Sequence, residues 1–212
     1  MKWVYKLQRK VGRDFGIPNL MIVIVIAKLA VFLFSSLVQI NAASFLLFSR
    51  EAVLRGEIWR ALTFVFIPDD SNLLWLAFSL YFYWWIGSSL EHEWGTLGFN
   101  VFYFMGMVLA IIGGFITGFA TDLYLNITLF LAFATLFPNV EIRLFFFIPI
   151  RVKWLGWFNA AVYLFLIIVN SWPGRLEALL SLLNLLLFFG RDYYESVKGW
   201  IHHIKNRKNR YK

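Results

Sequence analysis

The side chains that could do chemistry in this chain are few, and most of them lie outside its apolar stretches. The three histidines are His92, in a charged stretch, and the adjacent pair His202 and His203 near the C-terminus. Neighbouring residues diverge on a helix, so neither Glu91-His92-Glu93 nor the histidine pair predicts a metal site. The absence of cysteine excludes disulfides, cysteine-ligated metals and thiol nucleophiles. We therefore expect no metal and no cofactor.

The most unusual ionisable residue is Lys28, because it lies about midway along an apolar run over residues 18–37. A charge at that depth is costly unless it is paired, hydrated or extended to the headgroups. Two interpretations stay open: Lys28 lines an inward-facing polar cavity, or its long side chain reaches the membrane surface. Asn126 and Asn184, which lie within later apolar runs, are further candidates to line a cavity or to contact a client.

Carboxylates and hydroxyls offer little catalytic chemistry. Asp122 and Glu177 lie at the ends of separate apolar runs, so the sequence predicts no carboxylate pair for aspartyl chemistry. A lysine can activate a serine, which leaves open a dyad between Lys28 and Ser79 or Ser181.

Composition indicates that lipid is the solvent for much of the chain. Of 212 residues, 60% are hydrophobic, 20% are aromatic and only 15% are charged, and the mean hydropathy is +0.68. A water-soluble core of this size cannot bury so much apolar surface. We therefore expect an all-α, multi-pass membrane protein with one membrane domain.

Six apolar runs predict a bundle of six transmembrane helices. They cover residues 18–37, 73–90, 97–120, 123–137, 155–172 and 176–189. The fourth run has only about 15 residues, too few to cross lipid comfortably, so we place it in the middle of the bundle. Gly114 and Gly118 in the third run form a small-xxx-small pair, which predicts the close approach of another helix.

The net charge of +8 is concentrated at the two ends of the chain. These ends divide the sequence into a basic N-terminus (1–17), a membrane domain (18–190) and a basic tail (191–212). Because both basic segments flank apolar runs, the positive-inside rule places both termini in the cytoplasm and no nucleic-acid partner is expected. Residues 193–212 are expected to form a basic amphipathic helix that frays, with surface anchoring or partner binding as its role.

The connections between the runs carry their own signals. Trp59 and Arg60 pair an indole with a charge before a short apolar run that ends at Pro68, which is typical of a segment lying along a bilayer surface. Residues 38–72 are therefore predicted to form an interfacial hairpin or short helices in the outer leaflet. Residues 144–150 are too few to span and predict a surface-lying or strand-like connector, and residues 173–175 predict an outside turn.

Three of these segments resemble the rhomboid superfamily. Gly56-Glu57-Ile58-Trp59-Arg60 resembles the Trp-Arg motif that lies between the first and second helices of that family. Leu90-Glu91-His92-Glu93-Trp94-Gly95 is similar to the acidic-glycine end of the second helix, which makes Glu91 and Gly95 structural candidates. Residues 132–139 and 148–155 resemble the exit of the fourth helix and the following connector in bacterial rhomboids.

The catalytic pair of an active rhomboid protease is missing from this pattern. The family's Gly-x-Ser-Gly would fall near Leu123, and its histidine would fall in the sixth helix, because a hydroxyl nucleophile needs an adjacent base. The chain has neither. It is most similar to derlins, which also keep the Trp-Arg motif and carry a first-helix lysine, here Lys28. Two departures are that Leu180 and Asn184 replace the sixth helix's Gly-xxx-Gly, and that the tail lacks a long extension.

The resemblance implies a rhomboid-like pseudoprotease that binds transmembrane clients and assists their extraction, degradation or quality control, with local bilayer thinning. Its implied partners are the lipid bilayer, client proteins and a protease or ATPase, and an oligomer is compatible with it. The implied location is a bacterial cell membrane, with the endoplasmic reticulum membrane as the alternative. Two other functions stay open: an intramembrane serine protease with a non-standard nucleophile, and a small transporter or channel around Lys28, Asn126 and Asn184.

Overall fold

The chain folds mainly into helices, and this computed structural model describes residues 2–39, 41–144 and 148–209. Helix accounts for 77% of the structure. Among the described residues, four helices are long and apolar enough to cross a membrane: α2 (Leu20–Val38), α6 (Leu73–Thr117), α8 (Val152–Val169) and the first half of α9 (Trp172–Asn209), over Trp172–Gly190. The structure is thus mostly helical with little sheet, which is consistent with the predicted all-α membrane protein, and the count of six spans stays a prediction.

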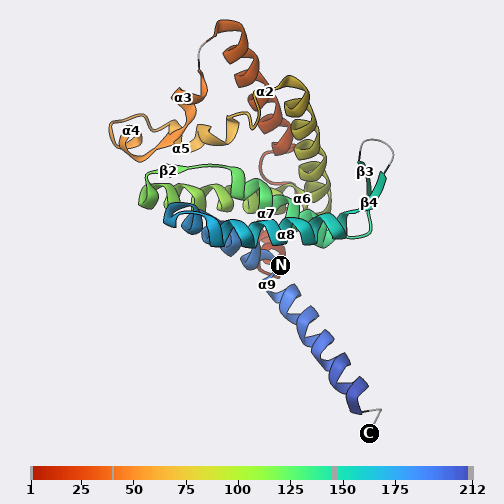
Figure 1. Cartoon of the computed structure of the whole chain (residues 1–212). Helices are drawn as coiled ribbons and strands as arrows, with labels where there is room; N and C mark the ends of the chain where they lie inside the picture. The colour runs from red at the N-terminus through yellow and green to blue at the C-terminus, as the bar shows by residue number, and fades with distance from the viewer. Residues whose placement is uncertain (1, 40, 145–147, 210–212) are drawn as a thin grey trace.

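The helices cross rather than lie all parallel. In Figure 1, α2 and the first part of α6 rise side by side, whereas the second part of α6, α7 (Leu123–Leu136) and α8 run across the molecule below them. α9 packs against α6, α7 and α8 and then leaves the body as a single helix. α7 therefore lies in the middle of the bundle, where its length predicted it, with most of its side chains buried.

α6 consists of two helical segments that are joined at Gly95. Its 45 residues would extend about 67 Å if straight, roughly twice the thickness of a hydrocarbon core. Gly95 breaks the helix with φ +73° and ψ 164°, a conformation that is essentially restricted to glycine. The first segment continues through Trp94, so Glu91 belongs to its last turn and the predicted end at residue 90 was too early.

The predicted turn at residues 173–175 is wrong. α9 already begins at Trp172, and Pro173 fits its first turn because the N–H that proline lacks would have no partner there. The link from α8 to α9 is only Asn170 and Ser171. Arg175 stabilises this link by donating from Nε to the Asn170 carbonyl (2.8 Å) and from Nη2 to the Ile168 carbonyl (2.8 Å).

The predicted role of Gly114 and Gly118 as a helix-packing pair is also wrong. α6 ends at Thr117, and Gly118 lies after it with φ +106°, where the chain reverses. A Cβ atom at Gly114 would overlap the Phe48 ring and the Ala120 side chain, which belong to two short strands and not to a helix. Closely packed glycines exist elsewhere on α6, because a Cβ at Gly106 would overlap Leu125 of α7.

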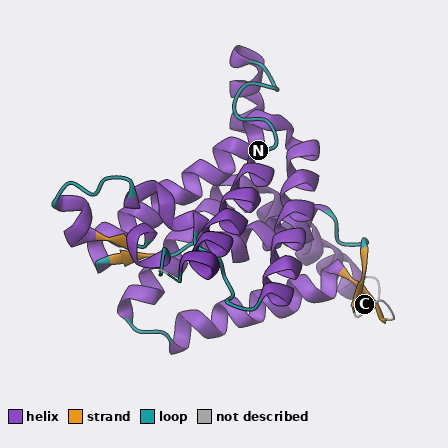
Figure 2. Cartoon of the chain, turned by 90° about the horizontal axis from the view of Figure 1, so that it is seen from above, coloured by secondary structure: helices purple, strands orange, loops and turns teal. Residues whose placement is uncertain are grey.

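Short elements close the two ends of the bundle. The segment between α2 and α6 contains α3 (Ala43–Leu46), β1 (Phe48–Ser49), α4 (Arg50–Leu54), α5 (Arg60–Thr63) and the 3-10 helix η1 (Phe64–Phe66), in agreement with the predicted short helices. β1 pairs antiparallel with β2 (Phe119–Ala120), and β3 (Glu141–Leu144) pairs antiparallel with β4 (Ile148–Arg151). The predicted connector is thus strand-like. Figure 2 shows the two strand pairs at opposite ends of the helical body.

The remaining helix, α1 (Lys2–Val11), packs against α6 and buries Val4. The helix α9 extends through most of the predicted basic tail, to Asn209. Whether the tail is amphipathic, and where His202 and His203 point, lie outside the side chains that the structure describes. The outer face of α8 exposes large apolar side chains such as Trp157 and Ile168, as a surface in contact with lipid would.

Candidate functional site

The candidate site is built around Lys28, whose side chain points into the protein. Lys28 is the ninth residue of α2 and only 1% of its surface is exposed. The side chain therefore faces inward as predicted and does not reach the headgroups, but Lys28 is not among the residues that line the neighbouring cavity.

The ammonium group of Lys28 has a partner for each of its three N–H donors. Its Nζ atom lies 2.8 Å from Oδ2 of Asp122, 3.0 Å from Oδ2 of Asp69 and 2.9 Å from the carbonyl oxygen of Ile67. A fully satisfied ammonium is what allows a lysine to stay buried. We call Lys28, Asp69 and Asp122 the ion cluster.

Three separate parts of the chain meet in the ion cluster. Asp69 follows η1 in the segment that leads to α6, and η1 packs against α2. Asp122 is the residue before α7, placed there by the chain reversal at Gly118. The main chain of Asp122 accepts the first helical bond of α7, from the N–H of Asn126 (2.9 Å). The ion cluster thus fixes α2, the start of α6 and the start of α7 to one another.

Asn126 and Tyr83 form a second layer around these charges. Asn126 donates from Nδ2 to Oδ2 of Asp122 (3.0 Å), so the structure brings together two of the predicted site residues, Lys28 and Asn126. The Lys28 ammonium lies 5.6 Å from the centre of the Tyr83 ring, within the range of a cation–π contact. Burial raises the pKa of the Asp122 carboxyl, while the positive charge of Lys28 opposes that rise.

Asp69 also borders a polar cavity. The cavity has a volume of about 450 Å³ and lies between the end of α2, α3 and the residues that precede α6. Its lining residues are Phe32, Ser35, Ser36, Gln39, Asn41, Ala43, Ile67, Pro68, Asp69, Asp70 and Ser71. The Asp69 side chain is 27% exposed, against 1% for Lys28, so the ion cluster is reached from this cavity through Asp69.

Asn184 is not joined to the ion cluster by any bond that the structure describes. Its Nδ2 atom donates to the carbonyl of Phe102 (3.1 Å) and lies against Gly106, while Oδ1 has no partner among the described atoms. Glu177 is buried on α9, and its Oε2 atom accepts a hydrogen bond from the Thr121 hydroxyl (3.5 Å). The structure therefore does not support grouping Asn184 with Lys28 and Asn126.

The serine hydroxyls that could have formed a dyad are bonded elsewhere. Ser79 donates to the Leu76 carbonyl (2.9 Å), and Ser181 donates to the Tyr124 carbonyl (2.8 Å). The N–H donors of Lys28 are directed at Asp69, Asp122 and the carbonyl of Ile67. Within the described part of the chain, no hydrogen bond joins a histidine side chain to a serine.

Trp59 and Arg60 hold the segment between α2 and α6 together. Arg60 donates from Nε to Glu57 (2.6 Å) and from Nη1 to the carbonyls of Ser44 (2.7 Å) and Leu47 (3.0 Å). Trp59 donates from Nε1 to the Phe45 carbonyl (3.2 Å). The Trp-Arg pair therefore fastens α5 to α3.

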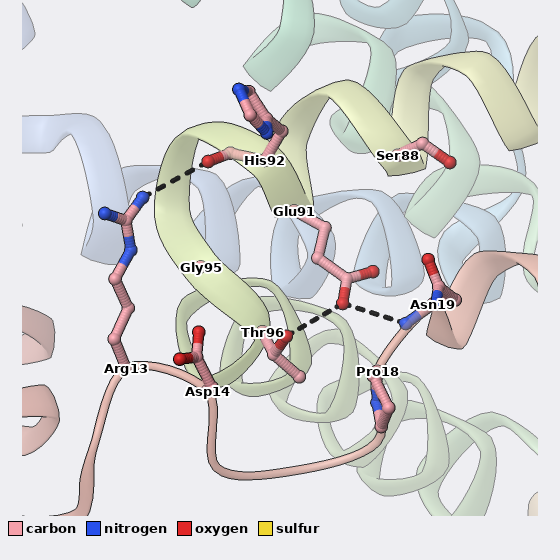
Figure 3. Close-up of a pocket in the computed structure, with 9 residues that line it drawn as sticks. All are labelled: Arg13, Asp14, Pro18, Asn19, Ser88, Glu91, His92, Gly95 and Thr96. Carbon is pink, nitrogen blue, oxygen red and sulfur yellow. Dashed lines mark hydrogen bonds between the residues drawn. The ribbon is translucent and has the colours of Figure 1, made fainter.

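Glu91 and Gly95 lie at the other end of the bundle, where α6 is broken (Figure 3). Oε1 of Glu91 accepts from the main-chain N–H of Asn19 (2.9 Å), at the start of α2, and from the Thr96 hydroxyl (3.0 Å). Arg13 lies over Gly95 and donates to the last carbonyls of the first segment of α6, at His92 and Glu93. These contacts define the helix break.

Asp69 was not among the site residues predicted from the sequence, and Asp122 was predicted only to lie at the end of an apolar run. One signal could have found both residues: a lysine inside a span needs a buried anion, and Asp69 and Asp122 directly flank apolar runs. The sequence does not show which carboxylates lie within hydrogen-bonding distance of Lys28.

Comparison with known protein families finds no family model that matches the chain, and comparison with curated proteins finds no match.

Proposed function

We propose that this chain is a rhomboid-like membrane protein without protease chemistry, which binds transmembrane segments of client proteins and assists their extraction, degradation or quality control. In this proposal the six spans are α2, the two segments of α6, α7, α8 and the first half of α9. Both termini are cytoplasmic, in keeping with the positive charge at the two ends of the chain. Extraction needs a source of energy, so a protease or ATPase partner is part of the proposal.

The observation that carries the proposal is the bond between Lys28, midway along α2, and Asp122, at the start of α7. Lys28 lies about 12 Å along α2 from Leu20, near the middle of that helix. Its direct bond to Asp122 places the polar start of α7 level with the middle of α2. Polar main chain and two carboxylates thus lie at a depth where an undisturbed bilayer holds only hydrocarbon.

The length of α7 supports the same conclusion. Its 14 residues extend about 21 Å, against about 30 Å for a typical hydrocarbon core. In this proposal the bilayer thins beside α7, where the polar ends of this short helix would otherwise meet lipid. Thinning shortens the path that a client segment travels on its way out, which is the physical basis of the proposed assistance.

The proposal is tested with the purified chain in lipid nanodiscs. Its ten tryptophans serve as fluorescence donors for a dansyl-labelled transmembrane peptide that carries one asparagine in its centre. We expect energy transfer that an excess of unlabelled peptide abolishes. We also expect a thinner bilayer around the protein by neutron scattering, in comparison with nanodiscs that hold a straight single-span helix. The proposal would be contradicted if unlabelled peptide leaves the energy transfer unchanged and the bilayer around the protein has the same thickness as in the control nanodiscs.

A small transporter or channel is the second candidate, and the cavity beside Asp69 favours it. That cavity gives polar solutes a route toward the ion cluster from one side. Ion flux from liposomes that contain the protein distinguishes the two candidate functions. If the protein conducts ions and Asp69→Asn abolishes that flux, transport is the function and client binding is not. Labelling by a fluorophosphonate probe would instead identify the chain as a serine hydrolase.

A further inference from the structure

A second cavity lies between the second half of α7, α8 and α9, whereas the ion cluster lies at the start of α7. It has a volume of about 590 Å³. We call it the lateral groove, and it is lined by Leu131, Ala134, Thr135, Pro138, Lys153, Gly156, Trp157, Ala160, Tyr163, Leu164, Leu182, Leu185 and Leu186. Nearly all of this lining is apolar, and it lies among the segments that contact lipid.

The lateral groove exists because small residues lie between large ones. Gly156 and Ala160 on α8 leave space beside Trp157 and Leu186. α7 and α8 are already in close contact at Gly156, because a Cβ atom there would lie 2.7 Å from the Cβ atom of Ala134. A larger residue at position 156 would therefore not fit. The hollow is therefore fixed by the close contact of α7 with α8.

The two ends of the lateral groove differ in polarity. Lys153 lies at one end, in the first turn of α8, and no carboxylate within the described residues forms an ion pair with it. Tyr163 closes the other end: its ring is buried and its hydroxyl donates to the Ala178 carbonyl. The groove is thus an open apolar slot with one cation at one end.

The length of the slot selects its occupant. From Lys153 to Leu164, α8 rises about 16 Å, which is half of a hydrocarbon core of about 30 Å and so one leaflet deep. A transmembrane helix would continue past Tyr163, whereas an acyl chain of a phospholipid ends near the middle of the bilayer. Lys153, whose ammonium lies 5.3 Å from the centre of the Trp154 ring, adds a preference for a negatively charged headgroup, since basic residues between transmembrane helices bind such headgroups.

We propose that the lateral groove binds an anionic phospholipid, with one acyl chain between α8 and α9 and its phosphate at Lys153. The site is separate from the ion cluster, and it does not depend on whether the chain binds clients. Its lipid would fill the space that Gly156 and Ala160 leave open and would hold α8 against α9.

The test is native mass spectrometry of the full chain, released from nanodiscs that contain equal amounts of phosphatidylglycerol and phosphatidylcholine. We expect one phosphatidylglycerol to be retained in preference to phosphatidylcholine. Lys153→Gln should lower that preference about fivefold, the effect of losing one basic residue near the headgroups. Lys10→Gln, which removes an exposed charge from α1, should leave the preference unchanged.

A second variant tests the apolar part of the lateral groove. Ala160→Phe places a ring in the slot without changing any charge, so it should lower the retention of both lipids. If this variant does not fold, Ala160→Leu serves the same purpose with a smaller side chain. Unchanged retention in a folded variant, or an equal effect of Lys10→Gln and Lys153→Gln, would overturn the proposal. So would a photocrosslinker at Trp157 that captures a transmembrane peptide and no lipid.

Discussion

The charges of the ion cluster are unequal, because one ammonium faces two carboxylates. Buried ion pairs contribute little net stability, since the cost of removing each charge from water offsets most of their attraction. Removing one partner has a much larger effect, because the remaining charge stays buried without compensation. Asp69 is partly exposed and can reach water, whereas Asp122 cannot.

Lys28→Met should therefore destabilise the protein by about 3–5 kcal/mol. The substitution leaves Asp122 buried with only Asn126 as a bonding partner. The free energy of unfolding, measured by denaturant titration in mild detergent and followed by circular dichroism, gives this difference. The double variant Lys28→Met, Asp122→Asn removes the buried anion too and should recover part of the loss. Equal stability of Lys28→Met and the natural chain would show that the ion cluster has no structural role.

The loss should also depend on pH. Burial raises the pKa of Asp122, and removing Lys28 takes away the charge that opposes this rise. A carboxyl whose pKa is raised by folding favours the folded state at low pH, and that contribution is lost as the pH rises through the raised pKa. The deficit of Lys28→Met should therefore grow as the pH rises above the ordinary pKa of an aspartate, about 4. A deficit that stays constant as the pH rises would contradict the assignment of Asp122 as the buried anion.

Arg60→Ala should loosen the segment between α2 and α6 without unfolding the bundle. The change removes the donors to Glu57, Ser44 and Leu47, and a lysine cannot reproduce the forked geometry. Limited proteolysis should cut both Arg60→Ala and Arg60→Lys faster within residues 41–66. Arg55→Ala is the matched control, because its ion pair with Glu51 is exposed and contributes little. If Arg55→Ala is cleaved as fast as Arg60→Ala, the contacts of Arg60 do not specifically stabilise this segment.

At the scale of helices and strands, two glycines with positive φ should differ in their tolerance of a side chain. Gly95→Ala adds a Cβ that overlaps Arg13, whereas Gly118→Ala adds one that meets no atom within 4 Å. Both variants pay for the strained backbone, about 1–3 kcal/mol each. Gly95→Ala should lose more, because the contact of Arg13 with the end of the helix is lost as well. Thermal unfolding of the two variants measures the difference, and equal losses would contradict it.

The helices themselves could be predicted from the sequence, but their ends could not. Apolar length and charge are sufficient to place α2 and α8 within a few residues. The start of α9 was missed because Pro173 and Gly174 are typical of turns, yet they also fit a first helical turn. Gly114 and Gly118 have the spacing of a packing motif, and only the position of Phe48 shows that Gly114 packs against a strand.

At the scale of the whole molecule, the stability of the protein should follow the thickness of the bilayer. A short α7 and a deep ion cluster fit a thin hydrocarbon layer better than a thick one. The melting temperature in nanodiscs should therefore be highest with short acyl chains and should fall as the chains are lengthened. A single-span helix of about 20 residues is the control for effects of the lipids themselves. A melting temperature that rises with chain length would contradict the proposed thinning.

The site was predictable only in part, for a reason of geometry. Lys28 was recognisable because a charge within an apolar run is conspicuous on its own. Asp69 and Asp122 are separated from it by 41 and 94 residues, and their roles depend on how three helices are placed relative to one another. Asn184 was wrongly grouped with Lys28, because its polarity within an apolar run does not show which residues it contacts.

The separation of Lys28 from Asp122 along the chain has a consequence for biosynthesis. Asp122 leaves the ribosome 94 residues after Lys28, so α2 enters the membrane before its buried anion exists. A lysine at the centre of a lone inserted helix costs about 2.5–3.5 kcal/mol, which offsets part of the gain from the apolar residues of α2. β1 likewise has no strand to pair with until Phe119 and Ala120 are made. The pairing of Lys28 with its buried anion is therefore completed only after both segments of α6 have been made.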